Sequence, residues 1–174
     1  MRLQARGVTV RYRGVTAVDR VDLDVTAGEV LALLGANGSG KSSLMRALAG
    51  LGSHAGSISW DGGHAAVGYM PQDNASAAAL TAFEVVLLGR LRRLSLHPGS
   101  ADLAAAEAAL AELGIAALAG RRIGTLSGGQ RQLVFLAQVL AAAPRAVLLD
   151  EPTSALDIAH QMQVLGMVRE VARR

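Results

Sequence analysis

The sequence lacks cysteine and is poor in aromatic residues, which make up 3% of its 174 residues. The absence of cysteine excludes disulfide bonds and thiolate metal sites. No run of about 18 apolar residues occurs, so a transmembrane helix is excluded. The first residues also lack the apolar stretch of a secretory signal. The 17 basic and 14 acidic residues give a net charge of +3, which is too small to indicate a nucleic-acid partner. These absences predict a soluble, intracellular chain of single-domain length.

Alanine and arginine dominate what is present. Hydrophobic residues make up 51% of the chain and 33 of them are alanines, which indicates closely packed helices with few large anchoring side chains. Arginine supplies 16 of the 17 basic residues, and Lys41 is the one lysine. A general preference for arginine explains these sixteen arginines. The same preference makes Lys41 informative, because only a slim ammonium fits into a tight cradle of backbone groups.

Hydrophobic periodicity predicts strands alternating with helices. We expect strands at 8–12, 21–25, 58–60 and 67–70, with buried strands at 30–34 and 147–149. We expect helices at about 41–51, 80–91, 101–113, 127–143 and 157–174, the last with Ile158, Met162, Leu165 and Val168 on its apolar side. Residues 1–174 are predicted to form one domain. Its α/β core spans 1–73 and 126–174, and a helical subdomain is inserted at about 74–125.

A glycine-rich loop lies between the predicted strand at 30–34 and the following helix. The segment from Gly35 to Ser42 fits the pattern G-x-x-x-x-G-K-[ST]. Its glycines allow successive backbone N–H groups to surround anionic oxygens, and the helix N-terminus adds partial positive charge. Lys41 can reach the β- and γ-phosphates, and the Ser42 hydroxyl can ligate Mg²⁺. A glycine turn that only caps a helix is the alternative, but the strand and helix on either side favour a nucleotide site.

Two acidic residues follow the predicted buried strand at 147–149. Asp150 is expected at the carboxyl edge of the sheet, where open α/β sheets bind ligands, and it could hold Mg²⁺. Glu151 could polarise an attacking water as a general base. A pair of solvated acids at a strand end is the alternative. The glycine loop favours the catalytic interpretation, because hydrolysis needs both sites.

A second candidate anion site opens the helix expected at 127–143. Leu126 to Gln130 reads Leu-Ser-Gly-Gly-Gln, which places an N-cap residue and two glycines at the helix start. One triphosphate needs only one such cradle, so a second one suggests that two chains share two nucleotides. An ordinary serine cap followed by flexible glycines is the alternative.

Five motifs in this order resemble the nucleotide-binding domains of ABC transporters, and the resemblance extends from Leu3 to Arg174. They look like that family's Walker A, Q-loop, LSGGQ signature, Walker B and D-loop, in the order 35–42, Gln72, 126–130, 147–151 and 154–157. The resemblance implies that ATP is bound by Tyr12, Gly35, Asn37, Gly38, Ser39, Gly40, Lys41, Ser42, Ser43, Ser127, Gly128, Gly129 and Gln130. It implies Mg²⁺ at Ser42, Gln72 and Asp150, and catalysis by Glu151 with Lys41 and Gln72.

The same resemblance implies an α/β P-loop NTPase fold with a parallel central sheet, an N-terminal antiparallel β subdomain and an inserted helical subdomain. Segments 80–90 and 156–161 resemble importers of ferric siderophores, haem and cobalamin. The implied function is an ATPase subunit that energises such an importer from the cytoplasmic face of the inner membrane. The implied partners are a second ATPase subunit, identical or paired, the transmembrane permease and, indirectly, a substrate-binding protein.

One departure concerns the carboxyl end. The family continues beyond the D-loop helix to a switch-loop histidine, whereas this sequence stops at Arg174, and His160 lies too early to fill that role. We therefore expect a C-terminally truncated chain that binds ATP with weak turnover. Two alternatives stay open: an ABC ATPase that does not serve transport, and a nucleotide-binding module with little turnover.

Overall fold

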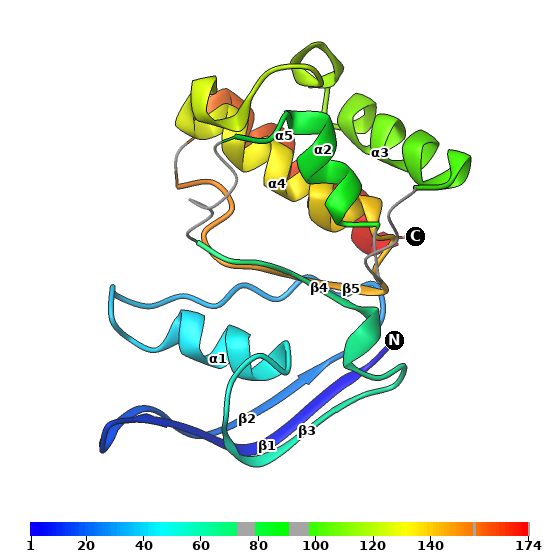
Figure 1. Ribbon diagram of the computed structural model, residues 1–174. Helices are drawn as coiled ribbons and strands as arrows, with labels where there is room; N and C mark the ends of the chain where they lie inside the picture. Colours follow the sequence, from blue (N-terminus) through cyan, green and yellow to red (C-terminus); the bar gives the residue numbers. More distant parts are fainter. Residues whose placement is uncertain (73–78, 91–97, 155, 174) are drawn as a thin grey trace.

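The computed structural model describes residues 1–72, 79–90, 98–154 and 156–173 and arranges them in layers (Figure 1). Its strands are β1 (Leu3–Tyr12), β2 (Val15–Val25), β3 (Ala55–Trp60), β4 (Val67–Met70) and β5 (Ala146–Leu149). Its α-helices are α1 (Lys41–Leu48), α2 (Ala82–Leu88), α3 (Ser100–Glu112), α4 (Gly128–Ala141) and α5 (Ile158–Arg173). Short 3₁₀ turns occupy η1 (His64–Ala66), η3 (Ala116–Leu118) and η4 (Ile123–Thr125). The expected mixed α/β class is confirmed, with one antiparallel and one parallel sheet.

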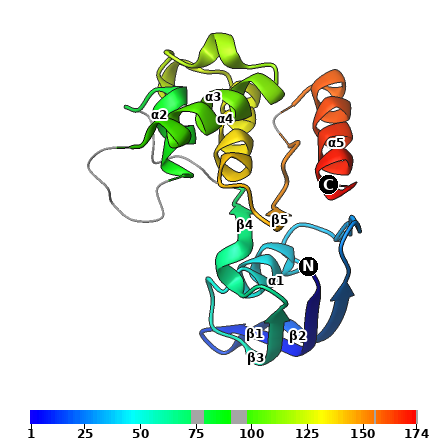
Figure 2. The same ribbon diagram turned by 90° about the vertical axis from the view of Figure 1, so that its right-hand side faces the viewer.

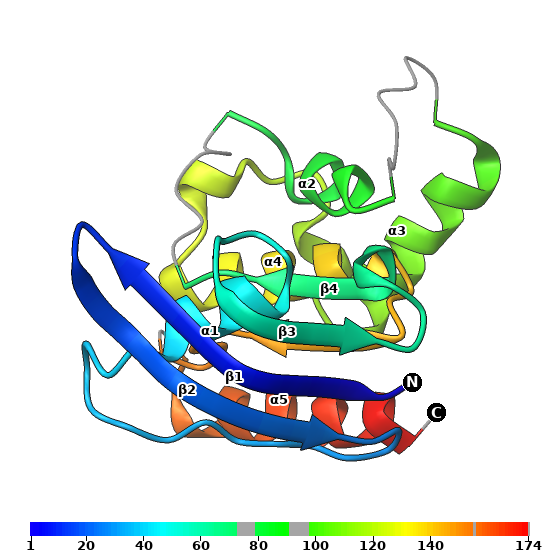
Figure 3. The ribbon, with the colours of Figure 1, turned by 90° about the horizontal axis from the view of Figure 1, so that it is seen from below.

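The first layer is an antiparallel sheet in the order β2-β1-β3, with α1 packed on its inner face (Figure 3). The buried face of β1 changes from odd to even positions at a register irregularity between Ala5 and Val8, so Leu3, Ala5, Val8 and Val10 are all buried. Leu44 and Leu48 of α1 complete this core. The expected strands at 8–12, 21–25 and 58–60 are therefore confirmed, and each is longer in the structure.

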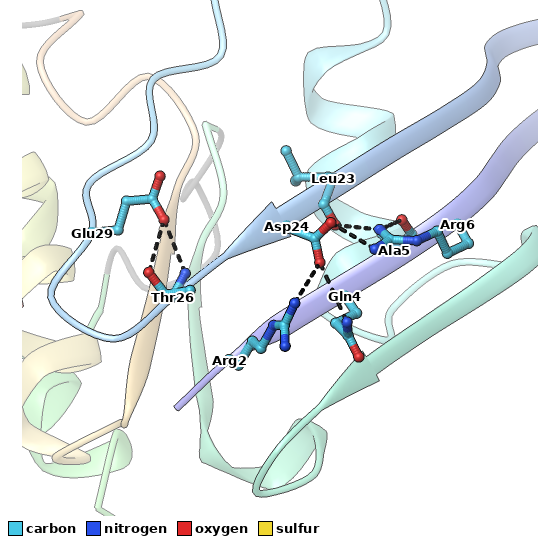
Figure 4. Close-up of polar contacts among 8 residues, drawn as sticks. All are labelled: Arg2, Gln4, Ala5, Arg6, Leu23, Asp24, Thr26 and Glu29. Atoms are coloured by element: carbon cyan, nitrogen blue, oxygen red, sulfur yellow. Dashed lines mark hydrogen bonds and ion pairs between the residues drawn. The ribbon is translucent and has the colours of Figure 1, made fainter.

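The outer face of this sheet is polar. Arg6 donates a hydrogen bond of 2.6 Å to Asp24, and Arg2 lies 3.5 Å from the same carboxylate (Figure 4). The Arg6 hydrogen bond lowers the pKa of Asp24 below its ordinary value. These charged groups are exposed to solvent, so their ion pairs contribute little to the stability of the fold.

The middle layer is a two-stranded parallel sheet, β4 beside β5. Tyr69 pairs with Leu148 and Met70 with Leu149, and the Asp150 amide extends the ladder to the Met70 carbonyl at 3.0 Å. Side chains of β5 alternate between the two neighbouring cores: Leu148 packs toward α1, and Leu149 packs toward the helices. Both strands were expected from the sequence, although β5 is half-buried.

Helices α2, α3 and α4 form the third layer around a core that includes Val86, Leu110 and Val134. α5 lies on the other side of α4 from α2 (Figure 2) and contributes the buried Val164. Small residues bring α2 and α4 close together, since a Cβ at Gly89 would overlap the carbonyl oxygen of Gln138. Within the described residues, no helix combines the length and hydrophobicity that crossing a bilayer requires.

The segment 30–34 is not the buried strand that its apolar run predicted. It pairs with no strand among the described residues, and Leu34 is 91% exposed. A short apolar run specifies neither strand nor burial by itself, because a strand also needs a neighbour for its backbone N–H and C=O groups.

Three helices also differ from expectation, and α2 spans Ala82–Leu88 where we expected about 80–91, a range whose last residue lies outside the described residues. α1 ends at Leu48 and not near Leu51, because Gly50 takes a left-handed φ of 73°. The amides of Gly50 and Leu51 bond back to Ala47 and Arg46, which is a Schellman termination.

The apolar side expected for α5 is largely exposed, at 78% for Ile158, 65% for Met162 and 48% for Leu165. The helix instead turns Val164 inward, with Val168 partly buried. The pattern correctly predicted a helix, but Ile158, Met162 and Leu165 are not its buried side, because Val164 is the residue that enters the helical core.

The contact between α2 and α4 generates a stability prediction. Substituting Gly89→Ala should destabilise the protein by about 1–3 kcal/mol, because the new methyl group must displace backbone of α4. Gly120→Ala is the matched control, since a Cβ there meets nothing within 4 Å. Chemical denaturation monitored by circular dichroism measures both. Equal stability of the two variants would contradict the close approach.

Candidate nucleotide site

The glycine-rich loop leads directly into α1 and has the backbone conformation that its sequence requires. Gly38 and Gly40 have φ angles of 80° and 91°, in the left-handed region that favours glycine. Gly40 also approaches β2 so closely that a Cβ would overlap the Ala17 carbonyl oxygen. Gly35 packs against the Ser39 hydroxyl. The loop therefore holds its shape through backbone geometry and leaves its peptide groups accessible.

Lys41 arches back over this loop. Its Nζ donates hydrogen bonds to the carbonyl oxygens of Gly35 and Ala36, at 2.8 and 3.0 Å. Asn37 and Ser39 are exposed on the loop, and Ser42 and Ser43 are half-buried in the first turn of α1. No side chain caps α1, whose N-cap is Gly40. Free amides and one ammonium at a helix start are groups that attract a phosphate.

Asp150 follows β5 directly and is 3% exposed, the one buried charge among the residues whose burial the structure describes. The Tyr69 hydroxyl, on β4, donates a 3.4 Å hydrogen bond to Oδ2 of Asp150. Burial raises the pKa of Tyr69, the Arg46 guanidinium opposes that shift, and Asp150 adds to it, so the phenol stays protonated at neutral pH. A buried carboxylate with one long hydrogen bond is suited to a cation.

Glu151 takes an unusual backbone conformation, with φ at 51°. Its carboxylate accepts a 2.9 Å hydrogen bond from Nε2 of Gln72. Its carbonyl oxygen accepts hydrogen bonds from Gln132 at 2.7 Å and from the Ser154 hydroxyl at 3.1 Å. A left-handed residue other than glycine costs roughly 1–2 kcal/mol. Such strain persists where surrounding contacts over-determine it, often at functional sites.

The segment Leu126 to Gln130 forms the start of α4. The Ser127 hydroxyl accepts from the Gln130 amide at 3.2 Å, and the Gln130 side chain accepts from the Ser127 amide at 3.1 Å. This is a capping box, the serine cap that the sequence offered as an alternative. Gly128 and Gly129 lie in the first turn and add no side chain there. A role for Ser127 to Gln130 with nucleotide therefore stays a prediction.

Tyr12 closes β1 next to the β1–β2 turn, paired with Val15, and is 48% exposed. An exposed ring at a strand end is available for stacking on a base. Its contact with adenine stays a prediction.

The structure brings Gln72, Asp150 and Glu151 together after the ends of β4 and β5. The loop 35–42 and these strand ends lie toward the same end of the molecule, on the left in Figures 1 and 3. Arg46 of α1 lies next to Tyr69, whose hydroxyl donates to Asp150. Ser127 to Gln130 belong to the separate helical layer.

Sequence reasoning missed Tyr69 and Gln132. The parallel register of β4 and β5 could have pointed to Tyr69, since its partner Leu148 shares a face with Asp150. Gln132 had no comparable signal, because its contact with Glu151 spans 19 residues of sequence and depends on how α4 packs.

Solved structures with the same fold are ATP-binding cassettes. A nucleotide-free cassette from an ABC transporter superimposes with a TM-score of 0.88 at 22% identity, covering 99% of this chain and 78% of that one. An ABC transporter assigned to the metal-chelate type, in an inward-facing conformation, gives a TM-score of 0.86 at 36% identity over 98% of this chain and 68% of that one. The fold is therefore that of P-loop ATPases of the cassette class.

The ABC transporter family model matches residues 18–154, and the chain belongs to this family. Members of the family bind and hydrolyse ATP, so the expected ATPase class is confirmed. The hemin import ATP-binding protein HmuV of Gloeobacter violaceus is 40% identical over 99% of this chain and 69% of its own length. The HmuV protein of Myxococcus xanthus is 44% identical, over 99% and 72%. The cobalamin import ATP-binding protein BtuD of Halobacterium salinarum is 34% identical, over 99% and 46%.

The strained backbone of Glu151 predicts different effects for two substitutions. Both Glu151→Ala and Glu151→Gly remove the carboxylate and its bond to Gln72, but only glycine also relieves the left-handed φ. Glu151→Gly should therefore be more stable than Glu151→Ala by about 1 kcal/mol. Urea unfolding of the two variants measures the difference. A glycine variant no more stable than the alanine variant would rule out the strain.

Proposed function

We propose that this chain is the ATP-hydrolysing subunit of a membrane importer for iron chelates, haem or cobalamin-type substrates. The observation that carries the proposal is the hydrogen bond between Gln72 and Glu151, directly beside the buried carboxylate of Asp150. These residues follow the ends of β4 and β5, which lie toward the end of the molecule where the glycine loop begins α1. Similarity to hemin and cobalamin import proteins supports the importer and its substrate class.

ATP would occupy the glycine loop. The amides at the start of α1 would surround the phosphates, and Lys41 would exchange its bonds to the Gly35 and Ala36 carbonyls for bonds to the β- and γ-phosphates. This exchange costs little, because both N–H groups that now donate to carbonyl oxygens would donate to phosphate oxygens instead. Tyr12 would stack on the adenine.

The donor set fits Mg²⁺. Asp150 offers a buried carboxylate and Ser42 a half-buried hydroxyl, both hard oxygen donors, with the Gln72 amide oxygen as a third. Within the described residues, no group of three or more His, Cys, Asp or Glu could hold an ion by itself. Mg²⁺ would therefore bind together with the phosphates and neutralise their charge.

Glu151 would act as the general base. Its carboxylate lies next to Gln72, so the two can orient one water toward the γ-phosphate and take up its proton. Glu151 combines this bond to Gln72 with a left-handed backbone conformation. Strain at this residue is therefore consistent with a role in turnover.

Transport requires partners. We propose a two-fold pair of ATPase subunits, in which Ser127 to Gln130 of one subunit face the nucleotide of the other. Closure of the pair on ATP would move the helical layer, with α2 and the Gln72 region against the permease on the cytoplasmic face of the membrane. A substrate-binding protein would act on the permease and not on this chain.

Replacing the proposed base should separate binding from turnover. Glu151→Gln should keep ATP affinity within about twofold and reduce phosphate release by at least about 100-fold, since an amide cannot accept the proton. Glu107→Gln, an exposed change on α3, should leave both unaffected. Calorimetric titration and a phosphate-release assay measure the two quantities. Undiminished release from the Glu151 variant would refute the assignment.

The importer assignment is tested with membrane partners. The chain should co-purify with a permease encoded beside it, and haem, a ferric siderophore or cobalamin should stimulate ATP hydrolysis of the reconstituted complex severalfold. The ligand that stimulates identifies the substrate. Hydrolysis that responds to RNA or DNA, with steep salt dependence, would instead indicate an ABC ATPase outside transport.

A further inference from the structure

Gln132 connects helix α4 with the backbone of Glu151. Its side-chain N–H donates to the Glu151 carbonyl oxygen at 2.7 Å, the shortest of the side-chain bonds that the Glu151 backbone receives. The carbonyl oxygen has two lone pairs, and Ser154 contributes through its hydroxyl at 3.1 Å and its amide at 3.3 Å. These bonds fix the peptide plane that follows Glu151, on the carboxyl side of the strained residue.

The donor sits on a rigid part of the molecule. Gln132 is followed by five consecutive buried residues, 133–137, which anchor α4 in the helical core. Ser127, the N-cap of this helix, lies five residues before Gln132, and its capping box fixes the first turn. A displacement at the start of α4 therefore moves Gln132 with it, because a capped and packed helix moves as one body.

The acceptor sits on the strained residue. Glu151 holds φ at 51°, a conformation that relaxes readily to the right-handed or extended region once its contacts are lost. Such a rotation about the backbone would swing the carboxylate away from Gln72. The short bond from Gln132 opposes it by holding the next peptide group in place.

We propose that Gln132 is a positioning residue. It holds Glu151 in its left-handed conformation, and it makes the direction of the carboxylate depend on the placement of α4, whose first turn is Ser127 to Gln130. Hydrolysis is then tuned by whatever seats the start of α4. The effect of Gln132 on hydrolysis rests on the proposed function. Its effect on the conformation of Glu151 concerns the protein without nucleotide and does not depend on that function.

The experiment compares three variants of the full chain. Gln132→Met keeps the length and removes the donor, Gln132→Glu keeps the shape and places a negative oxygen against the carbonyl, and Gln138→Met makes the same change elsewhere on α4. Amide exchange at Ser154, followed by NMR without nucleotide, reports the turn at Glu151. Phosphate release gives kcat and KM for ATP.

Loss of the donor should speed exchange at Ser154 about fivefold and lower kcat about tenfold, with KM within about twofold, the size expected for one hydrogen bond to a neutral acceptor. Gln132→Glu should exceed Gln132→Met in both effects, and Gln138→Met should match the wild type. Wild-type exchange and kcat in Gln132→Met would overturn the proposal, as would equal effects of Gln138→Met. Absence of phosphate release from the wild type would refute the proposed function, while exchange at Ser154 would still decide the conformational role of Gln132.

Discussion

The parallel pairing of β4 with β5 is the interaction on which the site depends. It places the ends of both strands at one edge, so Gln72 after β4 lies beside Asp150 and Glu151 after β5. The ladder even continues one residue past the strand, through the Asp150 amide and the Met70 carbonyl. Side chains of β5 pack into the cores on both faces, so this edge cannot shift without disturbing either core.

The three parts of the site, which are the glycine loop, Asp150 and Glu151, are held in place in different ways. Backbone geometry at Gly38 and Gly40 shapes the glycine loop, and a single ammonium closes it. Asp150 is held by burial, whereas Glu151 is held in a strained conformation by hydrogen bonds from several elements. An open loop, a fixed carboxylate and a strained glutamate, which we propose as the base, suit a protein that binds, hydrolyses and releases a nucleotide in turn.

Prediction from the sequence succeeded where the signal is local. Alternation along β1 and β2, the capping residue Ser127 and the strong helix formers of α3 each act within a few residues. It failed at segment 30–34, which has no pairing strand in the part of the chain that the structure describes, and at α5, which turns Val164 into the helical core. The grouping of Gln72 with Asp150 and Glu151 followed from motif order. Tyr69 and Gln132 escaped notice because their contacts with the acids cross 81 and 19 residues.

The amino-acid order alone determined the glycine turn, the one lysine, the acidic pair after an apolar run and the capped start of α4, since each depends on residues adjacent in the chain. Only the tertiary structure decided which side of α5 is buried and that a glutamine of α4 reaches the backbone of Glu151. It also left the apolar run before the glycine turn without a pairing strand among the described residues. Those outcomes depend on which surfaces meet when the layers pack, and short-range periodicity carries no information about the partner surface.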